Sequence, residues 1–321
     1  MSPLLEIKDL SVTFTTERAV VHALNGVNLT IGSGESVGLV GESGAGKTTT
    51  ALAVLNLLAK PAGKITNGDI LFEGKSVMSM SRKELRNMRG NRIGMIFQNP
   101  LTALNPTFTV GEQIALVIRE HQKVSKKDAM AKAAELLEMV GIPASRIGDY
   151  PHQFSGGMRQ RVGIAAGLAC NPSLLIADEP TTALDVTIQA QILELMRSLQ
   201  RQYGTSLLMI THNLGIIAEL CEKVAVMYGG TIIEYGKVSD VFKNPGHPYT
   251  VGLLGAVPSL DTKKEQLTAI PGNIANASSL PTGCSFHPRC AHCTEKCRQE
   301  RPEMTDVGQG HLVACHNYKE I

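Results

Sequence analysis

The segment GESGAGKT, residues 41–48, constrains the fold of this 321-residue chain more than any other stretch. It follows a short apolar strand predicted over Ser36–Val40 and opens a helix predicted over Thr48–Ala59. In a phosphate-binding loop, glycines let successive backbone N–H groups turn toward phosphate oxygens, and the helix N-terminus adds positive potential. A Gly-rich turn can also bind nothing, but the full pattern between a strand and a helix predicts a nucleoside triphosphate site.

The side chains of this loop have distinct expected roles. Lys47 is expected to reach the β- and γ-phosphates, and the Thr48 hydroxyl is expected to ligate Mg²⁺. The predicted nucleotide-binding residues of the loop are Gly41, Glu42, Ser43, Gly44, Ala45, Gly46, Lys47, Thr48 and Thr49.

A second motif, LLIADE, supplies two acids at the end of an apolar strand predicted over Leu174–Asp178. The carboxyl edge of a parallel sheet is where α/β proteins place ligands. We expect Asp178 to hold Mg²⁺ through water and Glu179 to orient and polarise the attacking water. A buried strand with a solvated acidic end is common when such a motif stands alone, but here it accompanies a phosphate loop.

Short strands alternate with amphipathic helices along the chain, which indicates an α/β fold with a mostly parallel sheet covered on both faces. The predicted strands are Leu4–Ile7, Val20–Ile31, Ile93–Phe97 and Ser206–Thr211, and the predicted helices are Val110–Arg119, Asp128–Val140 and Val186–Tyr203. Beyond about Gly236 the chain becomes rich in Pro, Gly, His and Cys. This change predicts one domain over residues 1–235 and a second over 236–321. We expect the first to have a phosphate-loop core with an antiparallel edge subdomain and a helical insertion near 100–153, and the second to be a metal-binding appendage.

Composition excludes several classes of function. A net charge of +2, no Trp and 4% aromatic residues argue against a protein that coats DNA or RNA. No apolar run has membrane-spanning length, and the start MSPLLEIKDL lacks the regions of a signal peptide. We therefore expect a cytoplasmic protein that reaches a membrane only through partners.

The segment FSGGMRQR, residues 154–161, resembles the LSGGQ signature of ATP-binding cassette (ABC) proteins, with Phe and Met replacing its first and last members. The resemblance continues in order over the first 235 residues. It implies a Q-loop glutamine at Gln98, also a Mg²⁺ ligand, a D-loop at 183–185, and a switch histidine at His212. It further implies that two subunits sandwich two ATP molecules. The residues it assigns to the nucleotide, beyond the loop and Asp178, are Phe14, Ser155, Gly156 and Gly157.

Three further segments resemble the ATPase subunits of dipeptide, oligopeptide and nickel importers: QNPLTALNP at 98–106, YPHQF at 150–154 and HPY at 247–249. The resemblance implies two permease subunits, a second homologous or identical ATPase, an extracytoplasmic binding protein acting indirectly, and a place on the cytoplasmic face of the membrane. One departure is Asn213, where Asp is frequent, which removes a charge near the γ-phosphate.

Two rival functions remain. A soluble ABC ATPase acting on DNA would need a long coiled coil, whereas about 107 residues separate Lys47 from Ser155. Ribosome-directed members carry two cassettes in one chain, and this chain has one. The other rival is a regulatory iron–sulfur sensor whose cassette merely dimerises, which the complete catalytic motifs disfavour.

Five of the seven cysteines lie between Cys284 and Cys315. In a cytosolic chain such clustering indicates metal before disulfides. The resemblance assigns Cys284, Cys290, Cys297 and Cys315 to a four-iron, four-sulfur (4Fe–4S) cluster and leaves Cys293 spare. Cys290-x-x-Cys293 by itself favours zinc, with His287, His292, His311 and His316 as alternate ligands. The two other cysteines, Cys170 and Cys221, lie in predicted helical apolar stretches and are expected in the core.

Overall fold

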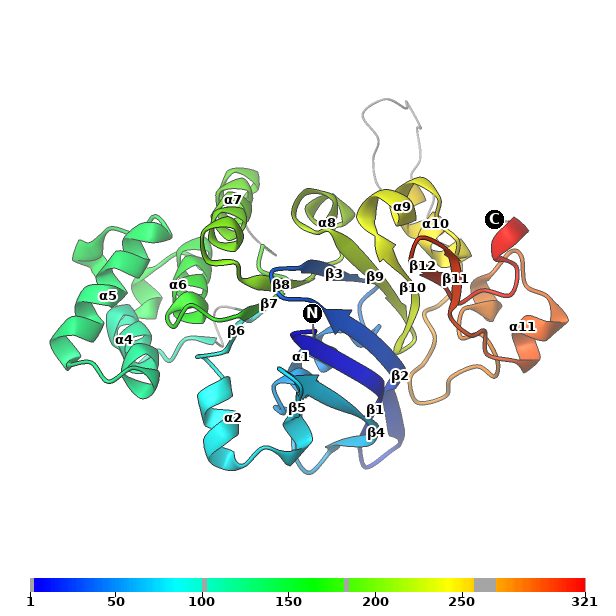
Figure 1. Cartoon of the computed structure of the whole chain (residues 1–321), viewed down its shortest axis with the longest axis horizontal. Coiled ribbons are helices and arrows are strands. Elements are labelled where there is room, and N and C mark those ends of the chain that lie inside the picture. The colour runs from blue at the N-terminus through cyan, green and yellow to red at the C-terminus, as the bar shows by residue number, and fades with distance from the viewer. Residues whose placement is uncertain (1–2, 100–102, 182–184, 257–269, 321) are drawn as a thin grey trace. The chain divides into compact units, whose positions relative to one another are not determined.

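The structure, a computed structural model, describes residues 3–99, 103–181, 185–256 and 270–320 (Figure 1). These residues form two compact units. The first comprises residues 32–35 and 79–209, and the second comprises residues 3–31, 36–78 and 210–320. The phosphate loop is in the second unit, whereas Gln98, the signature segment and the LLIADE strand are in the first. Each unit is described by itself.

The second unit contains an antiparallel sheet with strand order β2-β1-β4-β5. The long central strand β1 pairs with β2 on one side and with β4 on the other. Alternating apolar residues of β1, such as Leu5 and Ile7, are buried, as expected for a sheet with one face on a core. Its strands are β1 (Leu5–Thr15), β2 (Val20–Ile31), β4 (Gly63–Phe72) and β5 (Lys75–Ser76).

The same unit holds a run of strands in the order β11-β12-β10-β9-β3. The pair β3–β9 is parallel, and the pair β10–β12 joins the C-terminal segment to the sheet in antiparallel register. All five residues of β3 are buried, which agrees with its uninterrupted apolar sequence. These strands are β3 (Ser36–Val40), β9 (Lys223–Tyr228), β10 (Thr231–Lys237), β11 (Thr305–Gly308) and β12 (His311–Val313).

Helices of the second unit follow or precede these strands closely. The helix that leaves the phosphate loop, α1, begins at Lys47 directly after Gly46. Asn213 caps α8 by accepting a hydrogen bond from the Gly215 N–H. The helices are α1 (Lys47–Val54), α8 (Leu214–Leu220), α9 (Val238–Lys243), α10 (Pro248–Gly255) and α11 (Glu295–Gln299). Short 3₁₀ turns lie at Val77–Ser79, His287–Arg289 and Tyr318–Glu320.

The first unit contains strands in the order β8-β7-β6, and β6 and β7 are parallel. Gly94 in β6 lies so close to the Gly167 carbonyl that a Cβ there would sit 2.2 Å from the oxygen. A larger residue at position 94 would therefore push α6 off the strand. The strands are β6 (Ile93–Ile96), β7 (Leu174–Asp178) and β8 (Ser206–Ile210).

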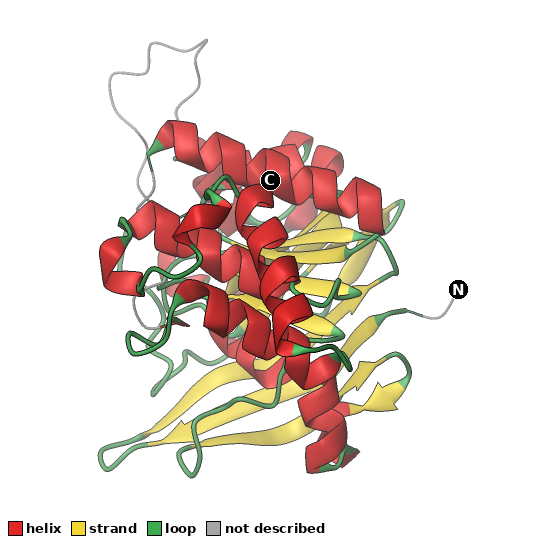
Figure 2. Ribbon diagram, turned by 90° about the vertical axis from the view of Figure 1, so that its left-hand side faces the viewer, coloured by secondary structure: helices red, strands yellow, loops and turns green. Residues whose placement is uncertain are grey.

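Helices α4, α5 and α6 of the first unit contact one another in every pairing and lie together in Figure 1; Figure 2 views them from the left-hand side of Figure 1. Thr109 and Glu112 form a capping box at the start of α4, and Ser125 caps α5. A side-chain N-cap stabilises a helix by about 1 kcal/mol. The helices are α2 (Arg82–Met88), α4 (Val110–His121), α5 (Lys126–Met139), α6 (Gly156–Leu168) and α7 (Val186–Tyr203). Two 3₁₀ turns, Ala144–Arg146 and Pro151–Gln153, connect α5 to α6.

Most predicted elements are confirmed, and three predictions were inaccurate. The helix after the phosphate loop ends at Val54, not at Ala59, because Asn56 has a left-handed backbone with φ 50°. The first strand continues from Ile7 to Thr15, since strands on both sides supply hydrogen bonds to its polar residues. Cys170 and Cys221 are buried as predicted, but they follow the ends of α6 and α8.

Two observations concern organisation. The boundary predicted after residue 235 falls inside β10, and the segment beyond it still contributes helices and two strands.

Among the described residues, the structure has no helix that is both long enough and apolar enough to cross a membrane.

Candidate functional site

The phosphate loop connects β3 to α1 and is held by its own lysine. Lys47 is buried, and its Nζ donates hydrogen bonds to the carbonyl oxygens of Gly41, at 2.7 Å, and Glu42, at 3.0 Å. Ser43, Gly44 and Thr48 are exposed. The loop therefore places a cation on its inner side and leaves a hydroxyl and backbone groups accessible, which suits an anionic ligand.

At two positions of this loop, the neighbouring backbone leaves no room for a side chain, so only glycine fits. Gly41 has φ 154°, and a Cβ on it would lie 2.2 Å from the Met227 carbonyl oxygen. Gly46 has φ 106°, and a Cβ on it would lie 2.7 Å from the Ala23 carbonyl oxygen. The backbones of β9 and β2 thus lie against the loop, and only glycines can adopt the positive φ angles of its sharp turn there.

In the first unit, the parallel strands β6 and β7 bring Gln98 and Glu179 together. Gln98 Nε2 donates a 3.0 Å hydrogen bond to Glu179 Oε2, although 81 positions separate the two residues. Glu179 has φ 47°, a left-handed conformation that costs about 1–3 kcal/mol for a residue with a side chain. Asp178, the last residue of β7, is 2% exposed. A strained acid held by an amide beside a buried acid is typical of a catalytic position.

The signature segment places Ser155 at the start of α6. Ser155 is the N-cap, and its Oγ accepts a 3.4 Å hydrogen bond from the Met158 N–H. Ser155 and Gly156 are exposed, and a Cβ built on Gly156 would come within 4 Å of no other described residue. Its φ is not positive and the described residues leave its surroundings open, so the described part of the chain does not require a glycine there. A helix N-terminus with a hydroxyl and an accessible backbone is suited to an anion from outside the chain.

The two departures from the LSGGQ pattern meet at one arginine. Phe154 is 3% exposed, and the Arg146 guanidinium lies over its ring, 4.2 Å from the centroid. Arg146 Nη1 also donates to Met158 Sδ at 3.6 Å. Arg146 Nε forms a 2.7 Å ion pair with Asp149. The variant residues therefore anchor the signature on the turn before α6, and sequence reasoning gave no role to Arg146.

The remaining predicted residues are distributed over both units. His212 is exposed after β8, and the next residue is the cap Asn213, so the Asn retains the capping role of an Asp. Asp185 caps α7, while Ala183 and Leu184 of the predicted D-loop lie outside the described residues. Phe14 lies near the end of β1, with its ring against Gly63 of β4.

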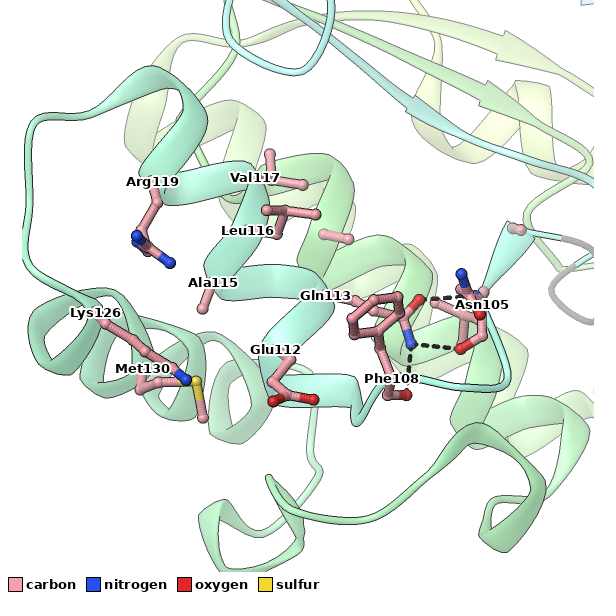
Figure 3. Close-up of a pocket in the computed structure, with 13 residues that line it drawn as sticks. Asn105, Phe108, Glu112, Gln113, Ala115, Leu116, Val117, Arg119, Lys126 and Met130 are labelled. Atoms are coloured by element: carbon pink, nitrogen blue, oxygen red, sulfur yellow. Dashed lines mark hydrogen bonds between the residues drawn. The ribbon is translucent and has the colours of Figure 1, made fainter.

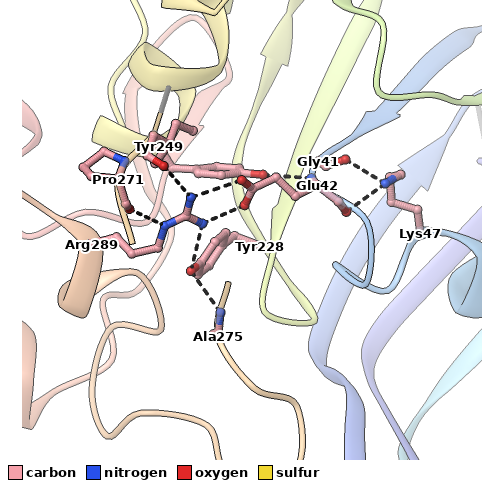
Figure 4. A network of polar contacts seen from close by, with 9 residues as sticks. Gly41, Glu42, Lys47, Tyr228, Tyr249, Pro271, Ala275 and Arg289 are labelled. Atoms are coloured by element: carbon pink, nitrogen blue, oxygen red, sulfur yellow. Dashed lines mark hydrogen bonds and ion pairs between the residues drawn. The ribbon is translucent and has the colours of Figure 1, made fainter. Parts of the chain in front are cut away.

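A network missed by sequence reasoning surrounds Glu42 of the phosphate loop (Figure 4). The Glu42 N–H donates to the Tyr249 hydroxyl at 2.9 Å. Arg289 donates from Nη1 to Glu42 Oε2 at 2.7 Å and from Nη2 to Glu42 Oε1 at 3.1 Å. These bonds raise the pKa of Arg289, whose side chain is only 3% exposed. The sequence gave no signal for this pair, because 247 positions separate the partners.

The predicted cysteine cluster is partly assembled in the second unit. Cys284, Cys290, Cys297 and Cys315 all line one small pocket, and Cys293 is not among its lining residues. Three of the proposed alternate ligands also line this pocket: His287, His292 and His316. The fourth, His311, instead bonds through Nε2 to Glu234 Oε1 at 2.7 Å.

The thiols of this pocket are poorly solvated. Burial raises the pKa of Cys284 and of Cys315 to about 11, and the neighbouring thiols add to the shift. The hydroxyl of Thr294 lies 3.2 Å from Cys297 Sγ. Across the described part of the chain, no three His, Cys, Asp or Glu side chains converge closely enough to hold a metal ion. The four predicted ligands thus share one pocket without the metal-binding geometry that was predicted.

Comparison with known proteins decides the family. A model described as "ABC transporter" matches residues 24–182, and a model of the "Oligopeptide/dipeptide transporter, C-terminal region" matches residues 233–297. The chain is 51% identical over 313 residues to the oligopeptide transport ATP-binding protein OppD of Bacillus subtilis, covering 97% of this chain and 87% of that protein. The chain belongs to the ATP-binding subunits of oligopeptide ABC transporters. OppD of Haemophilus influenzae is 48% identical, covering 98% of this chain and 97% of that protein.

Solved structures confirm the ABC cassette fold. A dimeric post-hydrolysis structure of the ATP-binding cassette MJ0796, bound to ADP and Pi, matches with a TM-score of 0.67 at 29% identity. It covers 73% of this chain and 98% of that chain. The CbiO1 cassette from Clostridium perfringens, part of an ABC transporter complex, matches with a TM-score of 0.63 at 29% identity. The phosphate loop and the LLIADE strand both lie within residues 24–182, which match the ABC transporter model.

Proposed function

We propose that this subunit hydrolyses ATP as one half of a nucleotide-sandwich dimer and thereby powers the import of short peptides through a membrane transporter. Its 51% identity over nearly its whole length to a protein named for oligopeptide transport is the observation that carries this substrate class. In the proposal, residues 1–235 form the ATPase domain, and residues 236–321 form an extension found in peptide transporters.

ATP hydrolysis is assigned to the motif residues as follows. Lys47 exchanges its contacts with the carbonyls of Gly41 and Glu42 for the β- and γ-phosphate oxygens. Glu179 polarises the attacking water, while the amide of Gln98 holds the carboxylate in place. His212 contacts the γ-phosphate, and Phe14 stacks on the adenine.

Mg²⁺ is assigned to oxygen donors of three types. Thr48 supplies a hydroxyl, Gln98 an amide oxygen and Asp178 a carboxylate, and such hard donors suit Mg²⁺. The buried position of Asp178 supports the assignment, because a carboxylate in an apolar strand end is stabilised by a nearby cation. When bound, Mg²⁺ neutralises charge on the phosphates.

The dimer supplies the other half of each site. Ser155, Gly156 and Gly157 are assigned to the γ-phosphate bound by the opposite subunit, which is either a second copy or a homologous ATPase. The open space around Gly156 supports this assignment, since a glycine is needed where another molecule approaches the backbone closely. Solved dimers of the MJ0796 cassette have the same fold.

A groove on the helical insertion is the proposed docking surface for a permease helix (Figure 3). It has a volume of about 430 Å³ and is mainly apolar. Leu116 on α4 and Phe108 just before it are 64% and 51% exposed, so large apolar side chains face the solvent. Gln113 fixes one wall, because its Nε2 donates 3.0 Å hydrogen bonds to the carbonyls of Asn105 and Phe108. An amphipathic helix would cover these side chains.

We further propose that the subunit lies peripherally on the cytoplasmic face of the membrane against two permease subunits. The extracytoplasmic binding protein acts on it only indirectly, through the permeases, and nucleic acid is not a partner. The charged residues Glu112, Arg119 and Lys126, which line the groove, supply complementary contacts to permease segments.

For the extension, we propose that Cys284, Cys290, Cys297 and Cys315 hold a 4Fe–4S cluster, with zinc as the alternative. The chemistry of the donor set supports it, because four thiols line one pocket. Burial raises the pKa of the Cys284 and Cys315 thiols, and bound metal would favour their thiolate forms. The cluster would supply a structural cross-link, since the segment buries few apolar side chains of its own.

Transport by the assembled system tests the proposal. The subunit is reconstituted in proteoliposomes with its permeases and binding protein, and ATP-dependent uptake of labelled di- and oligopeptides is measured beside uptake of Ni²⁺. Peptide uptake that stops with Lys47→Ala supports the proposal. Uptake of Ni²⁺ without peptide would assign the subunit to nickel import. ATP hydrolysis with uptake of neither would contradict the peptide assignment.

A further inference from the structure

Arg289 is a buried cation whose five N–H donors all have partners. Besides its two bonds to Glu42, Nε donates to the Pro271 carbonyl at 2.9 Å, Nη2 to the Ile270 carbonyl at 3.2 Å, and Nη1 to the Tyr228 hydroxyl at 3.4 Å. A guanidinium has five such donors, and bidentate binding fixes the plane of a carboxylate as well as its position. Arg289 therefore holds the Glu42 side chain in one orientation.

Three different parts of Glu42 are held at once. Tyr249 accepts from its backbone N–H, Lys47 donates to its carbonyl, and Arg289 binds its carboxylate (Figure 4). Tyr249 is fully buried and packs against the Tyr228 ring, with centroids 4.7 Å apart. The second residue of the phosphate loop is thus fixed by side chains from the distant C-terminal part of the chain, which reduces the freedom of the loop before any ligand binds.

The negative charge of Glu42 would oppose the binding of phosphate unless a cation neutralised it. A carboxylate beside a site for triphosphate repels the ligand, and the repulsion is strong where solvent is excluded. Arg289 supplies the opposite charge at hydrogen-bonding distance. Its side chain is 3% exposed and that of Glu42 is 25% exposed, so water screens the pair weakly.

The segment that carries Arg289 ties the phosphate loop to the cysteine pocket. Arg289 ends the 3₁₀ turn His287–Arg289, which lies between the pocket residues Cys284 and Cys290. Phe286 from the same segment packs edge-on against Tyr228 at 5.2 Å and against Tyr249 at 5.4 Å. The Cys284 N–H donates to the Cys297 carbonyl at 2.8 Å, which fixes the base of the segment.

We propose that Arg289 is a positioning residue of the nucleotide site: its guanidinium fixes and neutralises Glu42, so that the phosphate loop accepts the anionic phosphates of the nucleotide. The C-terminal extension, which carries Arg289, then contributes to the affinity of the phosphate loop for nucleotide. The inference rests on the proposed ATP-binding role of the loop.

The test measures the affinity of the full-length subunit for Mg²⁺–ATPγS by calorimetry, with melting temperature and circular dichroism confirming the fold. Arg289→Ala should weaken binding by about tenfold, because the Glu42 carboxylate loses its anchor and its counter-charge. Arg289→Lys should weaken binding by about threefold, since one ammonium replaces the charge but not the bidentate contact. Arg301→Ala is the control, because Arg301 is an exposed arginine of the same extension that donates to the Asn25 carbonyl and does not contact Glu42.

A second substitution tests whether Arg289 acts on nucleotide binding through Glu42 or only stabilises the fold. Adding Glu42→Gln to Arg289→Ala removes the uncompensated charge and should restore affinity to within about threefold of the wild type. A further loss of affinity in the double variant, or wild-type affinity in Arg289→Ala, would overturn the inference. If Arg289→Ala does not fold, the same comparison is made with Arg289→Lys. A wild-type subunit that binds no nucleotide would instead contradict the proposed function itself.

Discussion

Gln98 donates its side-chain amide to the carboxylate of Glu179 over 3.0 Å, at the ends of two adjacent parallel strands. The bond orients the acid proposed to activate water, and the left-handed backbone of Glu179 turns its side chain out of the strand direction. A base held by a neighbour loses less freedom when the reaction begins than one that must be ordered first.

Glu179→Gln should leave ATP affinity within about twofold of the wild type while slowing hydrolysis by about a hundredfold or more. The amide oxygen of Gln can still accept from Gln98, so the local structure is kept while the base is lost. Steady-state phosphate release and nucleotide binding are measured on the same preparations. Glu194→Gln on an exposed face of α7 is the control. Hydrolysis near the wild-type rate would remove Glu179 from the role of base.

Gly156→Ala should abolish most hydrolysis without lowering the melting temperature. Among the described residues the added methyl group would meet no side chain or neighbouring element within 4 Å, so an effect on turnover would indicate a molecule that approaches α6 from outside. Gly163→Ala on the same helix is the matched control, because the described residues leave open space around Gly163 as well. Phosphate release by both variants is compared with their thermal stability. Equal activity of the two variants would contradict a phosphate contact at Gly156.

Mixed dimers locate that contact in the partner. A dimer that combines a Gly156→Ala subunit with a Lys47→Ala subunit retains one composite site in which both motifs are intact. For dimers formed by one kind of chain, mixing the two inactive variants should therefore restore up to about half of the wild-type activity per mixed dimer, because one of its two composite sites is intact. Formation of mixed dimers is verified by differential tagging. No recovery in verified mixed dimers would contradict the cross-dimer assignment.

Local patterns predicted the parts of the site but not all of its contacts. The apolar runs of β3 and β7 and the loop between β3 and α1 follow from sequence, because burial and glycine content leave a local signal. The strand-end rule also predicted that acids would lie at the carboxyl edge of β7. The contact between Glu42 and Arg289 could not be predicted, since it joins residues 247 positions apart. A single arginine in a polar segment is more often a solvated surface residue than a buried ion-pair partner.

The boundaries of elements were harder to predict than their existence. Residues Leu55–Ala59 have helical composition, yet the chain leaves the helix after Val54 and turns at Asn56 with φ 50°. Similarly, Arg146 meets Phe154 and Met158 only because the turn before α6 folds back on the signature. Tertiary packing decides both features, and single-sequence propensity does not contain it.

Leu116→Asp should uncouple hydrolysis from transport. Leu116 is 64% exposed in the groove of the helical insertion, so a charge there leaves the isolated subunit folded but penalises burial under a permease helix. We expect unchanged basal ATPase activity of the free subunit and a loss of co-purification with the permeases by tenfold or more. Met139→Asp, 41% exposed at the end of α5 and outside the groove, is the control. Normal assembly of the Leu116 variant would move the docking surface elsewhere.

The cysteine pocket makes a prediction about metal content. Subunit purified without oxygen should be brown and contain about four irons per chain, because a 4Fe–4S cluster takes four thiolate ligands. Cys284→Ser should lose the iron and the visible absorption, since Cys284 lines the pocket together with Cys290, Cys297 and Cys315. Cys293→Ser is the matched control and should keep both, because Cys293 does not line the pocket and its Sγ instead contacts the Thr294 carbonyl at 3.5 Å. Iron is quantified by elemental analysis and the cluster type by electron paramagnetic resonance after reduction. Stoichiometric zinc without iron would establish the alternative metal, and loss of iron in the Cys293 variant would mean that a different set of four cysteines binds it.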